Sequence, residues 1–345
     1  LISSHILGEL EKIATHYGVI RQGKLIMELS AKDMDARNRQ FVSLKTKDMN
    51  GAFSILKTKY PKVKKEEAVW DVLKIQQELN VLPSFPSTII EGISLGFDFV
   101  EQARKLVEAA RKSDNVESFK QSFTEIEWLA PIPRTPKNIL CVGKNYNEHA
   151  IEMGEEKAPE NILVFTKAPT AIAADEATLP VHAGITDSLD YEGELAIVIG
   201  KRGQNIPKAL AFDYIFGYTI GNDLSARDVQ YRHGQYFLGK SLDGTCPLGP
   251  YLVSKDEIPD PQNLSIVTKV NGEIRQNSST KHMMFPVADI ISIVSQYVTL
   301  EPGDIILTGT PEGVGKGMNP PKYLKAGDEV KVSIEGIGTL ANRFA

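Results

Sequence analysis

The sequence predicts an α+β protein whose carboxyl-terminal part is rich in β-structure. From Asn138 onward, short apolar runs alternate with turns of Gly, Pro and Asn, which is typical of many short strands with few helices. The predicted strands cover residues 139–142, 162–165, 195–199, 266–270, 305–307 and 330–334. The length of 345 residues exceeds one typical domain, so we expect two or three units.

Three segments follow one another along the chain. Residues 1–65 are Lys-rich and predict a separate α/β fragment. Residues 66–130 predict a small N-terminal α/β subdomain, with the helical periodicity of Val100, Ala103, Leu106, Val107 and Ala110. A Pro-rich strip at 130–136 resembles a linker, and residues 131–345 then form the predicted β-rich domain that carries the chemistry.

The composition excludes several classes of protein. An apolar content of 42% is ample for a core, and the net charge of −5 gives no support for nucleic acid or an anionic membrane as a partner. No apolar run approaches transmembrane length, and we expect no signal peptide. Cys141 and Cys246 are too few for a disulfide framework, which favours a reducing cytoplasm.

Two glutamates at the start of a buried strand are the strongest chemical signal. Glu192 and Glu194 are two apart, so in a strand both point to one face. Such a pair needs a cation, a shared proton or a Lys/Arg partner. Asp223 follows a second apolar run and could supply a third carboxylate. Three carboxylates without a Cys or His cluster suit Mg²⁺ or Mn²⁺ better than Zn²⁺, whereas the alternative is a solvated surface pair.

A histidine and a glutamate form a second candidate pair. Residues 143–153 follow a predicted strand and begin a helix, for which Asn147 is the expected N-cap. His149 and Glu152 are three apart and share one helical face, so the carboxylate can orient the imidazole for acid–base work. The alternative is an ordinary pair at the start of a surface helix.

Two further segments offer a cation and a backbone cradle. Lys240 is a candidate cation near the carboxylates. Residues 308–315 form a Gly-rich turn after a predicted strand, and their N–H groups, including that of Gly309, could hold a carboxylate. Each segment could instead be a structural turn.

Residues 234–241 match the letters of a phosphate-binding P-loop. A working P-loop begins a helix directly after its Lys-Ser pair. Here Asp243-Gly244 and the prolines at 247 and 250 disfavour that helix. We therefore expect no nucleotide at this segment.

These motifs together resemble the fumarylacetoacetate hydrolase family over residues 68–345, in the branch of acylpyruvases and oxaloacetate decarboxylases. The shared motifs are Gly-Lys-Asn-Tyr with His149 and Glu152, Tyr-Glu-Gly-Glu-Leu-Ala, Asn-Asp-Leu-Ser-Ala-Arg-Asp, Gly-Lys-Ser-Leu-Asp and Thr-Gly-Thr-Pro-Glu-Gly-Val-Gly. The resemblance implies a β-rich fumarylacetoacetase C-terminal-like roll that forms a homodimer.

The resemblance also implies roles for individual residues. Glu192, Glu194 and Asp223 would hold Mg²⁺ or Mn²⁺. His149 and Glu152 would be the acid–base pair on a mobile lid, with Lys240 as a catalytic cation. The residues implied to bind the substrate are Arg227, Gln230, Gly309 and Thr310.

The first sixty residues resemble a different family, the ATP-binding subunits of ABC transporters. His5 would be the histidine near the γ-phosphate. No true P-loop, signature Ser-Gly-Gly or Asp-Glu pair precedes it, so we expect a fused tail without ATPase function. The alternative of a different class is a transporter-linked nucleotide-binding or regulatory module.

The resemblance implies metal-dependent cleavage of a C–C bond in a small 2-oxo acid. Hydrolysis of an acylpyruvate and decarboxylation of oxaloacetate would share a metal-stabilised enolate, and enol–keto tautomerisation of oxaloacetate is the alternative. The sequence has neither a Gly-x-Ser-x-Gly elbow nor a Cys–His motif, which argues against a covalent route.

Overall fold

The computed structural model describes residues 16–21, 24–30, 68–122, 126–156 and 159–345. The chain divides into two compact units, Leu1–Ala68 and Val69–Ala345. In the first unit, strands β1 (His16–Arg21) and β2 (Lys24–Ser30) form an antiparallel hairpin. The rest of the predicted ABC-like fragment, including His5, lies outside the described residues. Within the described part, no helix has the length and apolar character needed to cross a membrane.

The second unit begins with a helical region. It contains β3 (Ala68–Trp70), α4 (Val72–Leu79), α5 (Ile89–Ser94), α6 (Phe97–Arg111) and β4 (Lys120–Ser122). The predicted helix is confirmed as α6, which buries Leu106 and Ala110 against Ile75 of α4 and Phe119. Residues 69–130 belong to the same compact unit as the large sheets.

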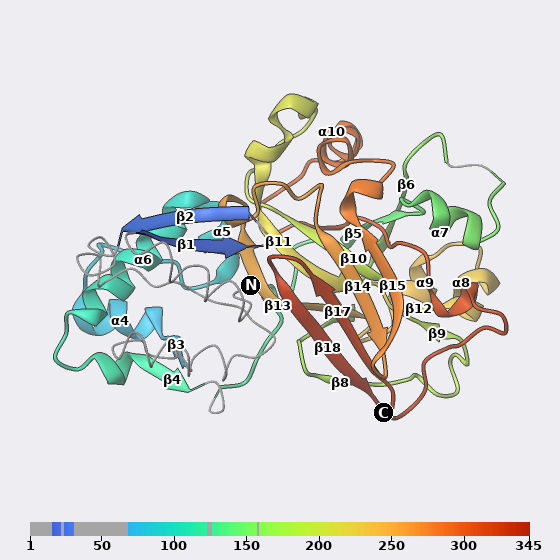
Figure 1. Ribbon diagram of the computed structural model, residues 1–345, viewed down its shortest axis with the longest axis horizontal. Helices are drawn as coiled ribbons and strands as arrows, with labels where there is room; N and C mark the ends of the chain where they lie inside the picture. Colours follow the sequence, from blue (N-terminus) through green and yellow to red (C-terminus); the bar gives the residue numbers. More distant parts are fainter. Residues whose placement is uncertain (1–15, 22–23, 31–67, 123–125, 157–158) are drawn as a thin grey trace. The chain divides into compact units, whose positions relative to one another are not determined.

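A seven-stranded sheet forms the centre of the β-rich part (Figure 1). Its strand order is β6-β5-β16-β10-β11-β13-β7. The strands are β5 (Ile139–Gly143), β6 (Leu163–Lys167), β7 (Ile172–Ala173), β10 (Gly193–Ile199), β11 (Ile215–Asn222), β13 (Cys246–Ser254) and β16 (Ile305–Leu307).

A five-stranded sheet, in the order β15-β14-β17-β18-β8, packs on the first. Its strands are β8 (Thr178–Leu179), β14 (Ser265–Val270), β15 (Glu273–Ser279), β17 (Glu329–Ile334) and β18 (Gly338–Phe344). Two further short strands, β9 (Leu189–Asp190) and β12 (Ser225–Ala226), pair with each other. All six strands predicted from the apolar runs are present, and the α+β fold with a curled sheet is confirmed.

Strand β10 is buried on both faces, which explains its uninterrupted apolar sequence. Leu195, Ile197 and Ile199 join the core shared with the five-stranded sheet, whereas Ala196 and Val198 join a second core on the opposite face. That second core includes Ile93, Ala130 and Ile132 from the segment before the sheet. The helical region therefore covers the face of the sheet that the five-stranded sheet leaves open.

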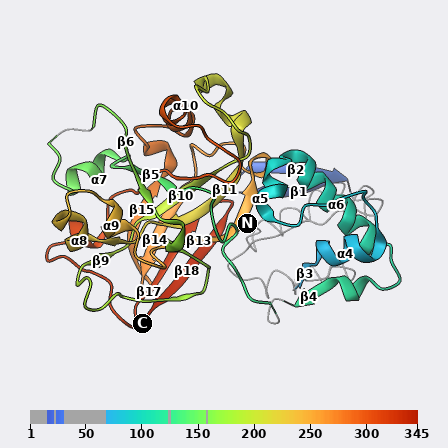
Figure 2. The same ribbon diagram turned by 180° about the vertical axis from the view of Figure 1, so that it is seen from behind.

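Strand register brings one end of β10 close to two other strand ends. Gly193 pairs with Asn222, so β10 begins where β11 ends. Ala196 pairs with Leu307, so the turn after β16 lies beside the same end. Helices α7 (Asn147–Glu152), α8 (Arg227–Arg232) and α9 (Phe237–Lys240) gather at one end of the β-rich part in both Figure 1 and Figure 2.

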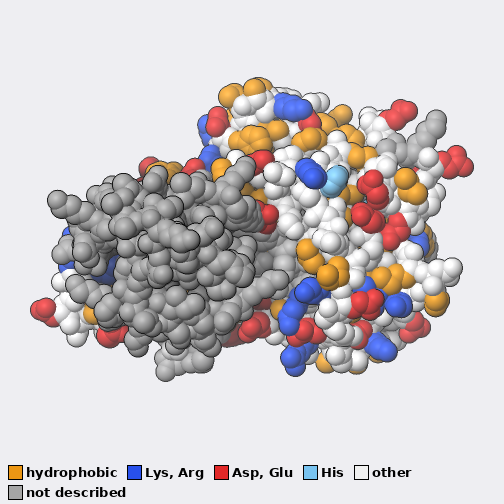
Figure 3. Space-filling view, viewed as in Figure 1, with side chains coloured by type: hydrophobic (Ala, Val, Ile, Leu, Met, Phe, Trp, Pro, Cys, Tyr) orange, Lys and Arg blue, Asp and Glu red, His pale blue; other side chains and the backbone are white. Residues whose placement is uncertain are grey.

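Among the described residues, one further α-helix, α10 (Val287–Tyr297), packs on the short 3₁₀ helix Lys208–Tyr214. Where Figure 3 shows the described surface, acidic and basic side chains are interspersed, in keeping with the net charge of −5.

Candidate active site

Three carboxylates meet where β10 begins and β11 ends. Oxygen atoms of Glu192, Glu194 and Asp223 lie within 4.8 Å of one another, and all three residues are buried. Glu192 and Glu194 flank Gly193, whose register partner Asn222 directly precedes Asp223. The predicted meeting of these carboxylates is confirmed, and the alternative of a solvated surface pair is wrong.

Buried cations neutralise two of the three carboxylates. Lys240 Nζ donates to Glu192 Oε2 at 2.6 Å and to Asp223 Oδ2 at 2.8 Å. Lys167 Nζ donates to Asp223 Oδ1 at 2.7 Å, and Arg227 Nη2 lies 2.7 Å from Glu192 Oε1. Burial opposes the charge on Lys240, but Asp223 and Glu192 more than offset it and raise the pKa of the ammonium. Burial likewise opposes ionisation of Glu192, yet Lys240 and Arg227 lower its pKa.

Glu194 is the carboxylate of this cluster that has no Lys or Arg partner in the described part of the chain. Burial, with the charges of Asp223 and Glu192, raises the pKa of its carboxyl group well above the usual value. Its Oε2 accepts a hydrogen bond of 2.6 Å from the Gly309 N–H, and Oε1 has no hydrogen-bond partner among the described residues. A carboxyl group without a cationic partner gives the cluster capacity for a further cation.

The acid–base pair lies on helix α7. His149 is 4% exposed, and its Nδ1 lies 3.1 Å from Glu152 Oε2, so the predicted contact is confirmed. Glu152 Oε1 accepts a bond of 3.0 Å from the Gly313 N–H. A Cβ at Gly317 would lie 2.1 Å from that same oxygen, so a larger residue there would displace the Glu152 carboxylate from this position. The expected N-cap was wrong by one position, because Asn147 is the first helical residue and Tyr146 the cap, without a side-chain bond.

The Gly-rich turn holds carboxylates of the protein itself. The N–H groups of Gly309, Gly313 and Gly315 donate to Glu194, Glu152 and Asp190 at 2.6, 3.0 and 2.7 Å. Gly309 has φ of +95°, and a Cβ there would lie 2.7 Å from the Asn145 side chain. The turn therefore joins the acid–base pair to the carboxylate cluster.

Thr310 is placed by two hydrogen bonds. Its Oγ1 donates to the Gly193 carbonyl at 3.0 Å and accepts from Gln276 Nε2 at 2.7 Å. Gln276 Oε1 in turn accepts from the Gly193 N–H at 3.0 Å. The Thr310 hydroxyl thus fixes the backbone between the two glutamates.

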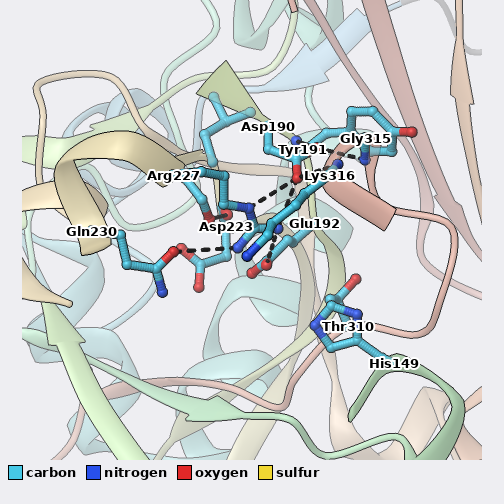
Figure 4. A network of polar contacts seen from close by, with 12 residues as sticks. His149, Asp190, Tyr191, Glu192, Asp223, Arg227, Gln230, Thr310, Gly315 and Lys316 are labelled. Carbon is cyan, nitrogen blue, oxygen red and sulfur yellow. Dashed lines mark hydrogen bonds and ion pairs between the residues drawn. The ribbon is translucent and has the colours of Figure 1, made fainter. Parts of the chain in front are cut away.

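Arg227 and Gln230 both lie on helix α8. In Figure 4 the side chains of Asp190, Glu192 and Arg227 point toward one another, and Arg227 Nε donates to Asp190 Oδ2 at 2.9 Å. Arg227 Nη1 lies 3.5 Å from Gln230 Oε1. The Gln230 amide nitrogen has no hydrogen-bond partner in the part of the chain that the structure describes, so it can donate to a ligand.

One cavity of about 220 Å³ joins these groups. Its lining includes His149, Glu192, Glu194, Arg227, Gln230, Lys240 and Thr310, together with Val142, Gly143, Lys144, Met153, Glu155, Phe165, Tyr231 and Tyr236. Most of the predicted site residues therefore face one space. Gly309 and Asp223 do not line the cavity themselves. Gly309 donates to Glu194, and Asp223 accepts from Lys240, and both of these partners line the cavity.

The sequence reasoning missed three residues. Lys167 ends strand β6, Asp190 ends β9 and Gln276 lies in β15, and each is fully buried. A polar residue at the end of an apolar run was the available signal for Lys167, whereas Asp190 follows Ser188 and Leu189 and has no such signal. No local pattern marks Gln276, because its partners Gly193 and Thr310 come from two distant segments.

The P-loop match at 234–241 has no P-loop structure. Helix α9 ends at Lys240, and no helix begins between Ser241 and β13. The expectation of no P-loop helix after Lys-Ser is confirmed, and Lys240 instead binds the carboxylates.

Comparisons with known proteins agree with this geometry. Residues 138–345 match the fumarylacetoacetate (FAA) hydrolase C-terminal family. An uncharacterized protein of Staphylococcus haemolyticus is 51% identical over 286 residues, which cover 82% of this chain and 94% of that protein.

Two solved structures show the same fold. A fumarylacetoacetate hydrolase from the psychrophile Exiguobacterium antarcticum is 46% identical, with a TM-score of 0.61 over 70% of this chain and 86% of the other. A fumarylpyruvate hydrolase from Pseudomonas aeruginosa, in complex with Mn²⁺ and pyruvate, is 33% identical, with a TM-score of 0.56 over 61% of this chain and 89% of the other. The chain belongs to the fumarylacetoacetate hydrolase family.

Proposed function

We propose that the protein is a Mg²⁺- or Mn²⁺-dependent enzyme that cleaves a C–C bond of a small 2-oxo acid. The reaction is hydrolysis of an acylpyruvate-type substrate or decarboxylation of oxaloacetate. The observation that carries the proposal is a cavity lined by Glu192, Glu194, Lys240 and His149, in which Asp223 binds Lys240 and Glu152 binds His149 from behind the lining. This combination offers a cation site and a proton-transfer group to one small molecule.

The carboxylate cluster fits a hard divalent cation. Its donors are carboxylate oxygens within 4.8 Å of one another, the ligand type that Mg²⁺ and Mn²⁺ prefer. Glu194 Oε1 has no partner in the described part of the chain, and the Glu194 carboxyl carries a raised pKa that an added positive charge would relieve. A cation held by Glu192, Glu194 and Asp223 would supply Lewis acidity toward the oxygens of a 2-oxo acid.

Lys240 is the second source of positive charge. Its ammonium is 2% exposed and holds Glu192 and Asp223 at 2.6 and 2.8 Å. Both cleavage reactions develop negative charge on the 2-oxo oxygen as the enolate of pyruvate forms. A preorganised ammonium in a buried site stabilises such charge far better than water does. Lys240 therefore contributes to catalysis through electrostatic stabilisation.

His149 provides the base for hydrolysis. When ionised, Glu152 accepts a hydrogen bond from His149 Nδ1–H, which leaves Nε2 of a neutral ring without a proton. Nε2 can then take a proton from a water molecule that attacks the distal carbonyl, and later return it to the enolate carbon. The Gly313 N–H and the space at Gly317 fix the Glu152 carboxylate for this task.

Arg227, Gln230 and Thr310 shape the space for the substrate. Arg227 is committed to Asp190 and Glu192, so its role is to set the charge and position of Glu192. The Gln230 amide nitrogen is the polar group of this set that can donate directly to a substrate oxygen. Thr310 contributes by fixing the backbone at Gly193.

Tautomerisation of a 2-oxo acid is the second candidate. The observation that favours it is that the His149–Glu152 pair alone can move a proton between the enol oxygen and the adjacent carbon. Such a reaction needs no attacking water and no bond cleavage.

A coupled pyruvate assay tests the proposal. Oxaloacetate and several acylpyruvates are offered with Mn²⁺ and after exhaustive chelation, and spectroscopic loss of the enol form reports tautomerisation. Glu117→Gln serves as a control, because Glu117 is 78% exposed and far from the cluster in sequence. We expect pyruvate formation that chelation abolishes and Mn²⁺ restores in both the parent protein and this control. Pyruvate formation that survives chelation would rule out the metal-dependent route.

A further inference from the structure

The cavity is lined by three cations, and one of them differs from the other two. Arg227 and Lys240 are almost fully buried, and each holds two of the site's own carboxylates. Lys144 lies between β5 and α7, and its side chain is 22% exposed. Its φ of +52° is in the left-handed region that residues with a Cβ rarely adopt, which fixes the direction in which its side chain leaves the backbone.

Lys144 has a partner that it can exchange. Within the described residues, its carboxylate partner is Glu155, whose side chain is 43% exposed. A partly exposed pair of this kind contributes little to stability, because water solvates both charges well when they separate. A ligand carboxylate can therefore take the place of Glu155 at small cost, whereas it could not displace the buried carboxylates from Arg227 or Lys240.

Aromatic side chains line the same cavity as these charged groups. Phe165 lies beneath the Lys240 ammonium, with Nζ 5.0 Å from the ring centroid, and packs edge-on against Tyr236 at 5.4 Å. The same cavity thus presents buried carboxylates and Lys240, aromatic rings, and the more exposed Lys144. This combination matches a molecule with an anionic 2-oxo acid head, a short carbon chain and a second anionic group.

We propose that Lys144 binds a carboxylate at the distal end of the substrate, so that the site prefers 2-oxo diacids to 2-oxo monoacids. This inference rests on the proposed function for the position of the 2-oxo acid head. Glu155 holds the ammonium in place in the free protein and gives it up to the ligand.

A purely structural role for the Lys144–Glu155 pair makes a different prediction. The two residues flank helix α7, so their ion pair could do no more than hold the helix that carries His149. In that case, removal of either partner would have the same effect on every ligand. A recognition role makes Lys144 and Glu155 act in opposite directions, because Glu155 competes with the distal carboxylate.

The test is a calorimetric binding measurement on the full-length protein with Mn²⁺. The ligands are 2-oxoglutarate and 2-oxopentanoate, which have the same number of carbons and differ in a distal carboxylate or methyl group. We expect Lys144→Met to weaken 2-oxoglutarate binding about tenfold, the usual effect of losing a charge-assisted hydrogen bond, and to change 2-oxopentanoate binding less than about twofold. Glu155→Gln should leave 2-oxoglutarate binding unchanged or tighter, and Lys144→Arg should retain the preference.

Two results would overturn the inference. One is an equal loss of affinity for both ligands in Lys144→Met and in Glu155→Gln, which would show that the ion pair only holds helix α7 in place. The other is a parent protein that binds the two ligands equally well. Neither ligand is cleaved, so this binding test does not depend on turnover. If the pyruvate assay fails but Lys144 still makes the protein prefer 2-oxoglutarate to 2-oxopentanoate, the proposed reaction is rejected and the binding role of Lys144 is retained.

Discussion

Lys167→Met should destabilise the protein strongly although Lys167 lies outside the recognised motifs. Its side chain is fully buried, and Nζ donates to Asp223 Oδ1 at 2.7 Å and to the Leu224 carbonyl at 2.9 Å. Methionine fills a similar volume but leaves both acceptors unpaired. Removing one partner of a buried ion pair costs about 3–5 kcal/mol, and we expect about 3 kcal/mol here because Lys240 still holds Asp223 Oδ2.

The assay is urea denaturation of the parent and variant proteins, followed by thermal unfolding. A loss of about 3 kcal/mol should lower the melting temperature by roughly 5–10 °C. Lys208→Met is the matched control, because Lys208 makes an ion pair of 2.6 Å with Asp289 while 62% exposed, and such a pair contributes less than about 1 kcal/mol. Mn²⁺ should restore more stability to Lys167→Met than to the control, since it supplies positive charge to Asp223. Equal destabilisation of the two variants would refute the reasoning.

Four further predictions concern the site and the chain as a whole. Glu192→Gln should abolish Mn²⁺ binding, measured by electron paramagnetic resonance, while circular dichroism shows that the fold is retained. An unchanged affinity for Mn²⁺ would exclude Glu192 as a ligand. His149→Ala should lower the rate of hydrolysis about 10²–10⁴-fold and leave the affinity for oxalate within about threefold of that of the parent protein. An unchanged rate of hydrolysis would show that His149 is not the base. Burial raises the pKa of Glu194, so this carboxyl group keeps its proton to a higher pH than an ordinary glutamate does, and that proton competes with the cation. Mn²⁺ affinity should therefore rise with pH, and a pH-independent affinity in calorimetry would contradict this assignment. Deletion of residues 1–65 should leave turnover largely intact, because every proposed site residue lies in the unit Val69–Ala345. A folded deletion protein that binds Mn²⁺ but has no turnover would show that residues 1–65 are needed for activity.

Short-range patterns in the sequence were sufficient to predict the strands and the two main pairs of site residues, Glu192 with Glu194 and His149 with Glu152. The apolar run of β10 predicted a strand because burial on both faces demands an uninterrupted apolar sequence, whereas β17 alternates buried and partly exposed residues with the period of a strand. The period of a strand placed Glu192 and Glu194 on one face, and the period of a helix placed Glu152 against His149. Each of these relations depends only on residues close together in the chain. The metal, the substrate, the homodimer and the role of residues 1–65 stay predictions.

The tertiary structure decided which charges meet and which groups the Gly-rich turn holds. Lys167 reaches Asp223 across 56 residues, Arg227 reaches Asp190 across 37, and Gln276 reaches Thr310 across 34. The sequence alone indicated that the turn could hold a carboxylate, and the structure shows that it holds Glu194, Glu152 and Asp190. These contacts follow from the register of β10 against β11 and β16, which residues distributed over the whole core determine together. No local spacing contains that information, because the free energy that selects the register comes from packing between segments distant in sequence.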